Sequence, residues 1–182
     1  MDDAAPTESA VIVAVPEADA AVGRWRSRLD PAAGWGVPAH VTVLYSFVPP
    51  AQITPAVLEA LAAAVQSVAA FDADFARVEW FGEQVVWLAP EPEVPFRALT
   101  ATVCAAFPSY LPYGGAFADP VPHLTIGDRA PLADLRAAAD AVLPQLPIST
   151  SVTTVQVICG SRSPDSWRMV AELPLGAATP RE

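Results

Sequence analysis

Two segments of the sequence share one short frame, and this repetition constrains the fold more than any other feature. Residues 38–45 read PAHVTVLY and residues 121–128 read VPHLTIGD, so each contains His-x-Thr followed by an aliphatic residue. The frames hold both histidines of the chain, His40 and His123. Successive side chains of a strand point to opposite faces. Each frame therefore predicts a strand with His and Thr on one face and aliphatic residues on the other.

The segments around each frame repeat in the same order, namely strand, helix, loop, histidine strand, helix and strand. The two histidines are separated by nearly half of the 182 residues. Two copies predict two lobes related by an approximate two-fold axis. We expect one bilobal domain over residues 1–182, with mobile tails at about 1–8 and 176–182. Besides the histidine strands, the expected strands are 9–15, 71–81, 84–90, 148–160 and 166–175, and the expected helices are 17–29, 54–70, 94–107 and 131–143.

The composition of the basic residues excludes several kinds of enzyme chemistry. All ten are arginine, and lysine is absent from the chain. This excludes a ligase that passes through a lysine-AMP adduct, a P-loop with its lysine, and a lysine Schiff base. The formal charge of −10 argues against a protein that holds a long nucleic acid by its phosphates.

Metal, redox and membrane signals are weak. Two histidines together with Cys104 and Cys159 match no zinc spacing, and two cysteines are too few for a disulfide framework. We therefore expect no metal and no other cofactor. The acidic, polar N-terminus does not resemble a secretory signal, and no apolar run approaches the roughly 20 residues of a membrane helix. These features predict a cytoplasmic protein that does not bind membranes.

The paired frames have a direct chemical interpretation. If the two strands lie side by side, two imidazoles and two hydroxyls, those of Thr42 and Thr125, converge on one cleft. Imidazoles that titrate near neutral pH can supply one base and one acid, as in-line cleavage of a phosphodiester requires. The hydroxyls can donate hydrogen bonds to the non-bridging oxygens. One such histidine alone is more often structural, but two matching copies favour catalysis.

The pairs His40-Val-Thr42-Val and His123-Leu-Thr125-Ile resemble the 2H phosphoesterase superfamily, in particular its 2′-5′ RNA ligase and cyclic phosphodiesterase branch. The element order matches as well, over about residues 9–175. The resemblance implies an α+β fold of two lobes with antiparallel sheets lining a central cleft and helices outside. It also implies that His40 is the acid for the leaving 3′ oxygen and that His123 is the base for water. The sequence alone does not distinguish these two roles.

The second frame departs from the family pattern. Many relatives have an arginine five residues after the second histidine, where this chain has Asp128, and Arg129 follows one residue later. Arg129 is a candidate phosphate ligand because its planar guanidinium suits bidentate binding; the alternative is a solvated loop arginine.

Aromatic residues near the frames could stack a base, and Tyr113, beside two glycines in the loop before His123, is the best candidate. For Trp80 and Phe81 we expect core or interface packing instead. The arginines of residues 23–28, read as GRWRSR, are interpreted as an exposed helix face.

The resulting hypothesis is a monomeric, metal-independent phosphodiesterase. Its expected substrates are 2′,3′-cyclic phosphates of RNA ends or small nucleotides, opened to 2′-phosphates, with 2′-5′ ligation as the reverse reaction. A long duplex is not expected because the acidic protein would repel it. Two alternatives stay open: a non-catalytic module that binds nucleotides or RNA ends, and a related enzyme that acts on another cyclic nucleotide or oligonucleotide.

Overall fold

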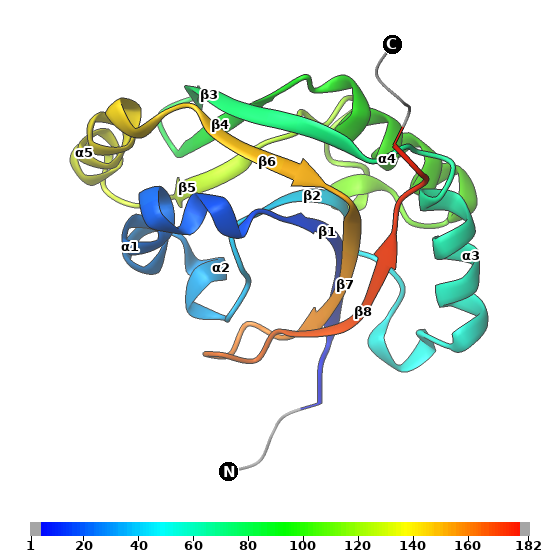
Figure 1. Cartoon of the computed structure of the whole chain (residues 1–182). Coiled ribbons are helices and arrows are strands. Elements are labelled where there is room, and N and C mark those ends of the chain that lie inside the picture. Colours follow the sequence, from blue (N-terminus) through cyan, green and yellow to red (C-terminus); the bar gives the residue numbers. More distant parts are fainter. Residues whose placement is uncertain (1–4, 179–182) are drawn as a thin grey trace.

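The structure is a computed structural model that describes residues 5–178. Within these residues the strands form an eight-stranded sheet, with the order β6-β3-β4-β5-β2-β1-β7-β8, and neighbouring strands are antiparallel. The sheet curls strongly (Figure 1). The strands are β1 (Glu8–Ala14), β2 (His40–Tyr45), β3 (Phe71–Phe81), β4 (Val85–Glu91), β5 (Leu124–Asp128), β6 (Ile148–Val152), β7 (Thr154–Gly160) and β8 (Arg168–Pro174).

The helices pack on the outer face of the curl, with α1 and α5 beside β5 and with α3 and α4 on the other side (Figure 1). They bury a continuous core against the sheet that includes Phe75, Phe96 and Leu135. The α-helices are α1 (Asp19–Leu29), α2 (Pro31–Gly34), α3 (Pro55–Val65), α4 (Val94–Ala106) and α5 (Leu132–Val142), and short 3₁₀ turns cover Pro16–Ala18, Pro50–Gln52, Pro112–Gly115 and Leu143–Gln145. The predicted α+β fold with antiparallel strands inside and helices outside is confirmed.

Helix α3 begins where the sequence predicts, but it ends earlier than predicted. The Thr54 hydroxyl accepts a hydrogen bond from the Val57 amide at 3.3 Å, which satisfies a free donor of the first turn. The predicted helix over 54–70 is too long, because α3 ends at Val65. The backbone beyond it pairs with Gly176 instead, whose amide donates to the Val68 carbonyl at 2.8 Å and whose carbonyl accepts from Ala70 at 2.9 Å.

The expected single strand over 148–160 is also wrong. The chain leaves one edge of the sheet as β6, which pairs with β3, and after Thr153 it continues as β7, which pairs with β1. Because the sheet curls, one extended segment spans from one side of it to the other (Figure 1). The halves of the sheet are therefore not the halves of the chain, since β3 lies beside β4 and β7 lies beside β1.

Both predicted tails include residues that are held by backbone hydrogen bonds. The Thr7 amide donates to the Gly160 carbonyl at 2.8 Å, and Gly176 is tied to residues 68–70 as described. The remaining parts of the predicted mobile tails, residues 1–4 and 179–182, lie outside the described residues. No helix within residues 5–178 has the length and apolarity to cross a bilayer.

Candidate active site

The two histidine strands are neighbours at the centre of the sheet. β2 and β5 pair antiparallel with Val41 opposite Leu124, and both of these side chains are buried in the core. Extending this register by one residue on each side puts His40 opposite Thr125 and Thr42 opposite His123, all on the inner face. The two histidines then lie on a diagonal, for which neighbouring residues are ~7–8 Å apart and their Cβ atoms somewhat closer.

The two strands match residue for residue in burial. From His40 to Tyr45 and from His123 to Asp128 the order is half-buried, buried, half-buried, buried, buried, half-buried. The two adjacent buried residues arise from bulges at equivalent positions, because Val43 and Ile126 are each the extra residue opposite β1 and β4. After the bulge, Tyr45 and Asp128 return to the inner face.

Both imidazoles are held by the same kind of bond. His40 Nδ1 lies 2.8 Å from the Pro38 carbonyl, and His123 Nδ1 lies 2.7 Å from the Val121 carbonyl. A carbonyl only accepts, so each Nδ1 carries a proton and each Nε2 is left for chemistry. His40 Nε2 lies 3.2 Å from the Thr42 hydroxyl, which donates to it in this tautomer.

The surroundings of the histidines differ in charge. Burial and the Arg26 guanidinium lower the pKa of His40 from 6.5 to about 3; the Pro38 carbonyl opposes this shift and His123 adds to it. Burial also lowers the pKa of His123, but the Val121 carbonyl and the Asp128 carboxylate oppose the shift. Both imidazoles are therefore neutral at pH 7.

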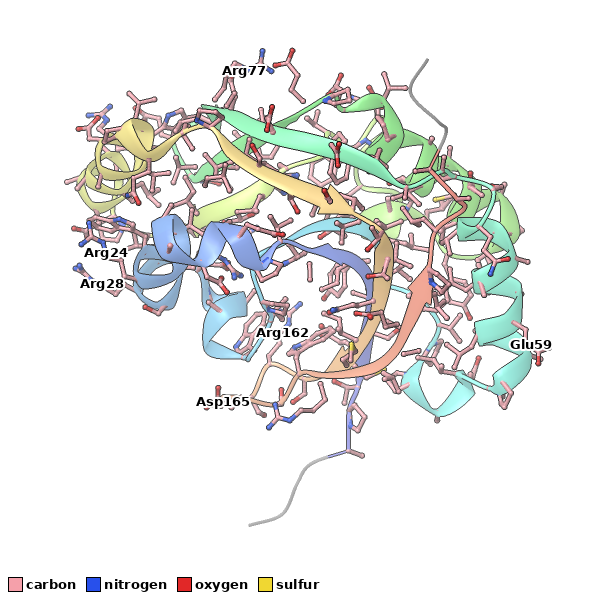
Figure 2. All side chains as sticks on the ribbon, in the orientation of Figure 1. Arg24, Arg28, Glu59, Arg77, Arg162 and Asp165 are labelled. Atoms are coloured by element: carbon pink, nitrogen blue, oxygen red, sulfur yellow. The ribbon has the colours of Figure 1, made fainter. Side chains whose placement is uncertain are left out.

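Arg26 itself was expected on an exposed helix face, and this expectation is wrong. Its side chain is buried, with Nε and Nη2 at 3.1 and 2.9 Å from Asp30 Oδ2 and with Nη2 at 3.3 Å from the Val37 carbonyl. Its neighbours Arg24 and Arg28 are exposed, project from α1 (Figure 2) and stack on Trp25. The local sequence did not reveal that the middle arginine faces inward.

Tyr113 lies at the site. Its ring packs against Tyr45 with centroids 6.4 Å apart. Burial raises the pKa of Tyr113, and the nearby Thr42 side chain opposes this rise. On the other side of the tyrosine pair, the Tyr45 hydroxyl donates to Glu8 at 2.7 Å, and Glu8 forms an ion pair with Arg162 at 3.3 Å.

Phe81 and Trp87 are site residues that the sequence interpretation missed. Their rings stack with centroids 4.7 Å apart, and they meet the His123 ring edge-on at 5.1 and 5.8 Å. Phe81 stays 38 % exposed. Strand alternation in β3 was the available signal, because it directs Phe81 and Trp80 to opposite faces.

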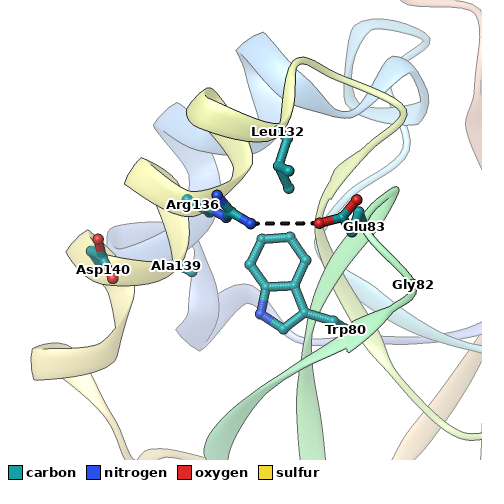
Figure 3. A pocket seen from close by; sticks show the side chains of 7 residues that line it. All are labelled: Trp80, Gly82, Glu83, Leu132, Arg136, Ala139 and Asp140. Carbon is teal, nitrogen blue, oxygen red and sulfur yellow. Dashed lines mark ion pairs between the residues drawn. The ribbon is translucent and has the colours of Figure 1, made fainter.

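Trp80 points to the outer face of the sheet. There it lines a pocket of about 450 Å³ against α5, beneath an ion pair between Arg136 and Glu83 of 3.5 Å (Figure 3). The expected packing role of Trp80 is consistent with this place, whereas Phe81 lies against a histidine.

Arg129 lies just past the end of β5. Its side chain is 81 % exposed and forms a loose ion pair with Asp128, with Nε 3.7 Å from Oδ1. Arg129 also has a left-handed backbone, with φ 54°, and its amide donates to the Gln84 carbonyl at 2.7 Å. The backbone is thus fixed while the guanidinium extends into solvent.

No cluster of three or more His, Cys, Asp or Glu side chains that could hold a metal ion occurs among residues 5–178. The groups that the inner face offers are imidazoles, hydroxyls and aromatic rings, with the Asp128 carboxylate at the end of β5. This set suits proton transfer and hydrogen bonding to a bound anion.

Comparison with known proteins agrees with this geometry. Residues 14–163 match the family described as the 2′-5′ RNA ligase superfamily. The chain belongs to this superfamily. No curated protein matched the sequence.

Solved structures with the same fold are distant in sequence. LigT of E. coli complexed with NADP+ is 18 % identical with a TM-score of 0.58, and the match covers 94 % of this chain and 98 % of LigT. LigT complexed with 3′-AMP is 19 % identical with a TM-score of 0.57, and the match covers 93 % of this chain and 98 % of LigT. The protein TT0787 of Thermus thermophilus is 18 % identical with a TM-score of 0.64, and the match covers 93 % of this chain and 98 % of TT0787. At these identities the likeness establishes the superfamily fold over nearly the whole chain.

Proposed function

We propose that the chain is a phosphodiesterase that hydrolyses 2′,3′-cyclic phosphates of RNA ends or small nucleotides to 2′-phosphates. The observation that carries the proposal is the convergence of two imidazoles, each fixed through Nδ1 to a carbonyl so that Nε2 is directed away from it, on the inner face of paired strands. Membership of the 2′-5′ RNA ligase superfamily supports it, as do the LigT structures with NADP+, ATP and 3′-AMP, which are nucleotides.

The diagonal arrangement suits in-line displacement. A phosphate between the imidazoles presents opposite sides to the two Nε2 atoms, so one histidine can deprotonate water while the other protonates the departing ribose oxygen. Bound phosphate, being anionic, favours a proton on the histidine pair, whereas burial disfavours it. The same site run in reverse would join a 2′-phosphate end to a hydroxyl without a nucleoside triphosphate.

The hydroxyls of Thr42 and Thr125 are the proposed ligands of the non-bridging oxygens. At rest Thr42 donates to His40 Nε2 at 3.2 Å, and rotation of its hydroxyl toward the phosphate would free that nitrogen for water. Arg129 is proposed to approach the phosphate from the end of β5, because its exposed side chain is free to reorient. Tyr113 is proposed to contact the base or ribose next to Thr42.

The acidic charge of the chain favours a small or end-on substrate. With a formal charge of −10, a long phosphate backbone would meet repulsion outside the site. A single terminal phosphate would meet the local groups, which are imidazoles, hydroxyls and the Asp128–Arg129 pair at the end of β5.

A turnover assay tests the proposal. Wild-type protein incubated with a 2′,3′-cyclic mononucleotide should form the 2′-phosphate, followed by ³¹P NMR, with and without EDTA. We expect equal rates in both, because acid and base are side chains. Binding without turnover would favour a nucleotide-binding module, and turnover confined to other members of a panel of cyclic and 2′-5′-linked nucleotides would favour a different cyclic substrate.

A further inference from the structure

The inner face of the sheet continues past the histidines onto β1 and β7. Ile12 of β1 lies opposite Thr42, and Ala10 lies opposite both Tyr45 of β2 and Ile158 of β7. Residues that are opposite one another in a sheet share a face. Ala10, Ile12 and Ile158 are buried and belong to a second apolar cluster, separate from the main core. The inner face therefore has an apolar floor beside the histidine strands.

Trp35 packs against this floor and is only half-buried. Its loop is tied to the loop that follows β7, because the Trp167 amide donates to the Trp35 carbonyl at 2.9 Å and the Asp165 amide donates to the Gly34 carbonyl at 3.1 Å. The loop after β7 also carries Arg162, whose Cζ lies 5.8 Å from the centre of the Trp35 ring. Figure 2 shows Arg162 on the inner side of the curl, beside α2. Two loops that are distant in sequence thus bring a guanidinium and an indole together.

The Arg162 side chain is held in place and still has donors to offer. Its Nε lies 3.3 Å from Glu8 Oε1, and the Tyr45 hydroxyl donates to the other oxygen of Glu8 at 2.7 Å. A guanidinium has five N–H donors, and the contact with Glu8 uses the one on Nε. The side chain is 68 % exposed, and ion pairs that are so exposed are weak. The outer nitrogens of Arg162 can therefore bind an anion while Glu8 keeps the side chain near the ring.

The histidine pair lies between this group and a second aromatic surface. Tyr45 is three residues beyond Thr42, ~10 Å along an extended strand, and Arg162 lies past Tyr45. On the other side of the histidines, toward β3 and β4, Phe81 is 38 % exposed and meets the His123 ring. The surface that could contact bases and phosphates therefore extends beyond the space that one nucleotide occupies.

We propose that Trp35 and Arg162 form a second subsite, which binds the nucleotide that precedes a cyclic-phosphate end. The Arg162 guanidinium binds the phosphodiester between the last two nucleotides, and the preceding base lies against the exposed part of the Trp35 ring. This inference rests on the proposed function and narrows its substrate class, because short RNA ends are then preferred over cyclic mononucleotides. One additional phosphate is compatible with the formal charge of −10, since Arg162 attracts it locally.

A comparison of substrate lengths tests the subsite. The wild-type protein is assayed on adenosine 2′,3′-cyclic phosphate and on the dinucleotide ApA that ends in the same cyclic phosphate. We expect kcat/KM to be at least about fivefold higher on the dinucleotide. Arg162→Ala should bring the ratio of the two values close to one, because it removes the contact that only the dinucleotide makes. Equal kcat/KM on both substrates in the wild-type protein would overturn the subsite.

Arg24→Ala is the matched control. Arg24 also lies over a tryptophan, with its Cζ 4.9 Å from the centre of the Trp25 ring, and it projects from the exposed side of α1 (Figure 2). This variant removes the same charge and the same kind of contact away from the inner face, so the preference for the dinucleotide should stay at its wild-type value. Loss of the preference in Arg24→Ala would show that the overall charge, and not the subsite, determines it.

Changes in the dinucleotide separate the phosphate contact from the base contact. A methylphosphonate linkage is neutral, so the wild-type protein should lose on it the advantage that Arg162 supplies, and Arg162→Ala should lose nothing more. Trp35→Phe keeps a ring on the apolar floor and should keep most of the preference, whereas removal of the preceding base should weaken it. An equal loss in Arg162→Ala on the charged and the neutral linkage would refute the phosphate contact.

Failure of the subsite is distinguishable from failure of the proposed function. If the wild-type protein turns over neither substrate, the function is wrong and the subsite falls with it. If it turns over both with the same kcat/KM, only the subsite is wrong.

Discussion

The strand that carries His40 and the strand that carries His123 share a burial pattern, a bulge position and an Nδ1 hydrogen bond to a carbonyl two residues earlier. They differ in the fifth residue after the histidine, Tyr45 in one and Asp128 in the other, and in the buried Arg26 behind His40. The comparison separates two tasks. The shared backbone fixes where the imidazoles lie, and the unlike neighbours give the two imidazoles different electrostatic surroundings.

The largest expected effect comes from removing either imidazole. His40→Ala and His123→Ala should each reduce turnover of a 2′,3′-cyclic nucleotide by roughly 10²–10⁴, the usual contribution of general acid or base catalysis. The double variant should fall by less than the product of the two losses, because the histidines act as a unit. Full activity in either single variant, measured as kcat on folded protein, would break the equivalence of the two strands.

The threonines should contribute less and should contribute equally. Thr42→Ala and Thr125→Ala each remove one donor to the non-bridging oxygens, for which we expect losses of at most roughly 10²–10³ in kcat. Thr→Ser at the same positions keeps the hydroxyl and should restore most of the rate. A strong loss at one threonine and none at the other would show that the strands do not share the phosphate.

The aromatic side chains beside His123 sharpen the comparison further. Phe81→Ala should raise KM for a nucleotide, with a loss of about 1–3 kcal/mol if a base stacks on the exposed ring. Trp80→Ala is the matched control, since the adjacent side chain points to the outer pocket beside Arg136 (Figure 3). It should alter thermal stability while leaving KM unchanged. An unchanged KM in Phe81→Ala would confine Phe81 to packing.

Per pH unit, the smallest effect is in stability against pH. The pKa of His40 is about 3 in the folded protein against 6.5 ordinarily, so the unfolded chain binds the proton first as pH falls. His40 therefore contributes a loss of stability from about pH 6.5 down toward 3, with a slope of at most about 1.4 kcal/mol per pH unit.

Denaturant unfolding at several pH values measures this slope. His40→Gln should flatten it more than His123→Gln, because Asp128 limits the shift at His123. A larger flattening in His123→Gln would reverse the electrostatic difference between the strands.

Much of the fold could be predicted from local patterns. The His-x-Thr alternation, the helix start at Thr54 and the Gly82-Glu83 turn between β3 and β4 each depend on a few neighbouring residues. The passage of residues 148–160 from one side of the sheet to the other depends on the curl of the whole sheet. No local pattern contains that information.

The candidate site likewise contains residues that local patterns predict and residues that depend on the tertiary structure. The four frame residues could be predicted because strand alternation alone puts His and Thr together. Arg26 could not, since its role depends on a tertiary neighbour, the Val37 carbonyl. For Phe81, strand alternation indicated the face of the sheet but not the contact with the His123 ring. Asp128 was visible as a departure from the family pattern, but its effect on His123 required the bulge that returns it to the inner face.

The central claim is that both histidines meet one phosphate, and the chain's two histidines make this directly measurable. Imidazole NMR of the wild-type protein should show two sets of ring signals, which titration with a 2′-nucleotide product can follow at a pH near 6. We predict that both sets shift with the same dissociation constant, because one phosphate contacts both Nε2 atoms. A shift in one set alone, or two different constants, would contradict the account.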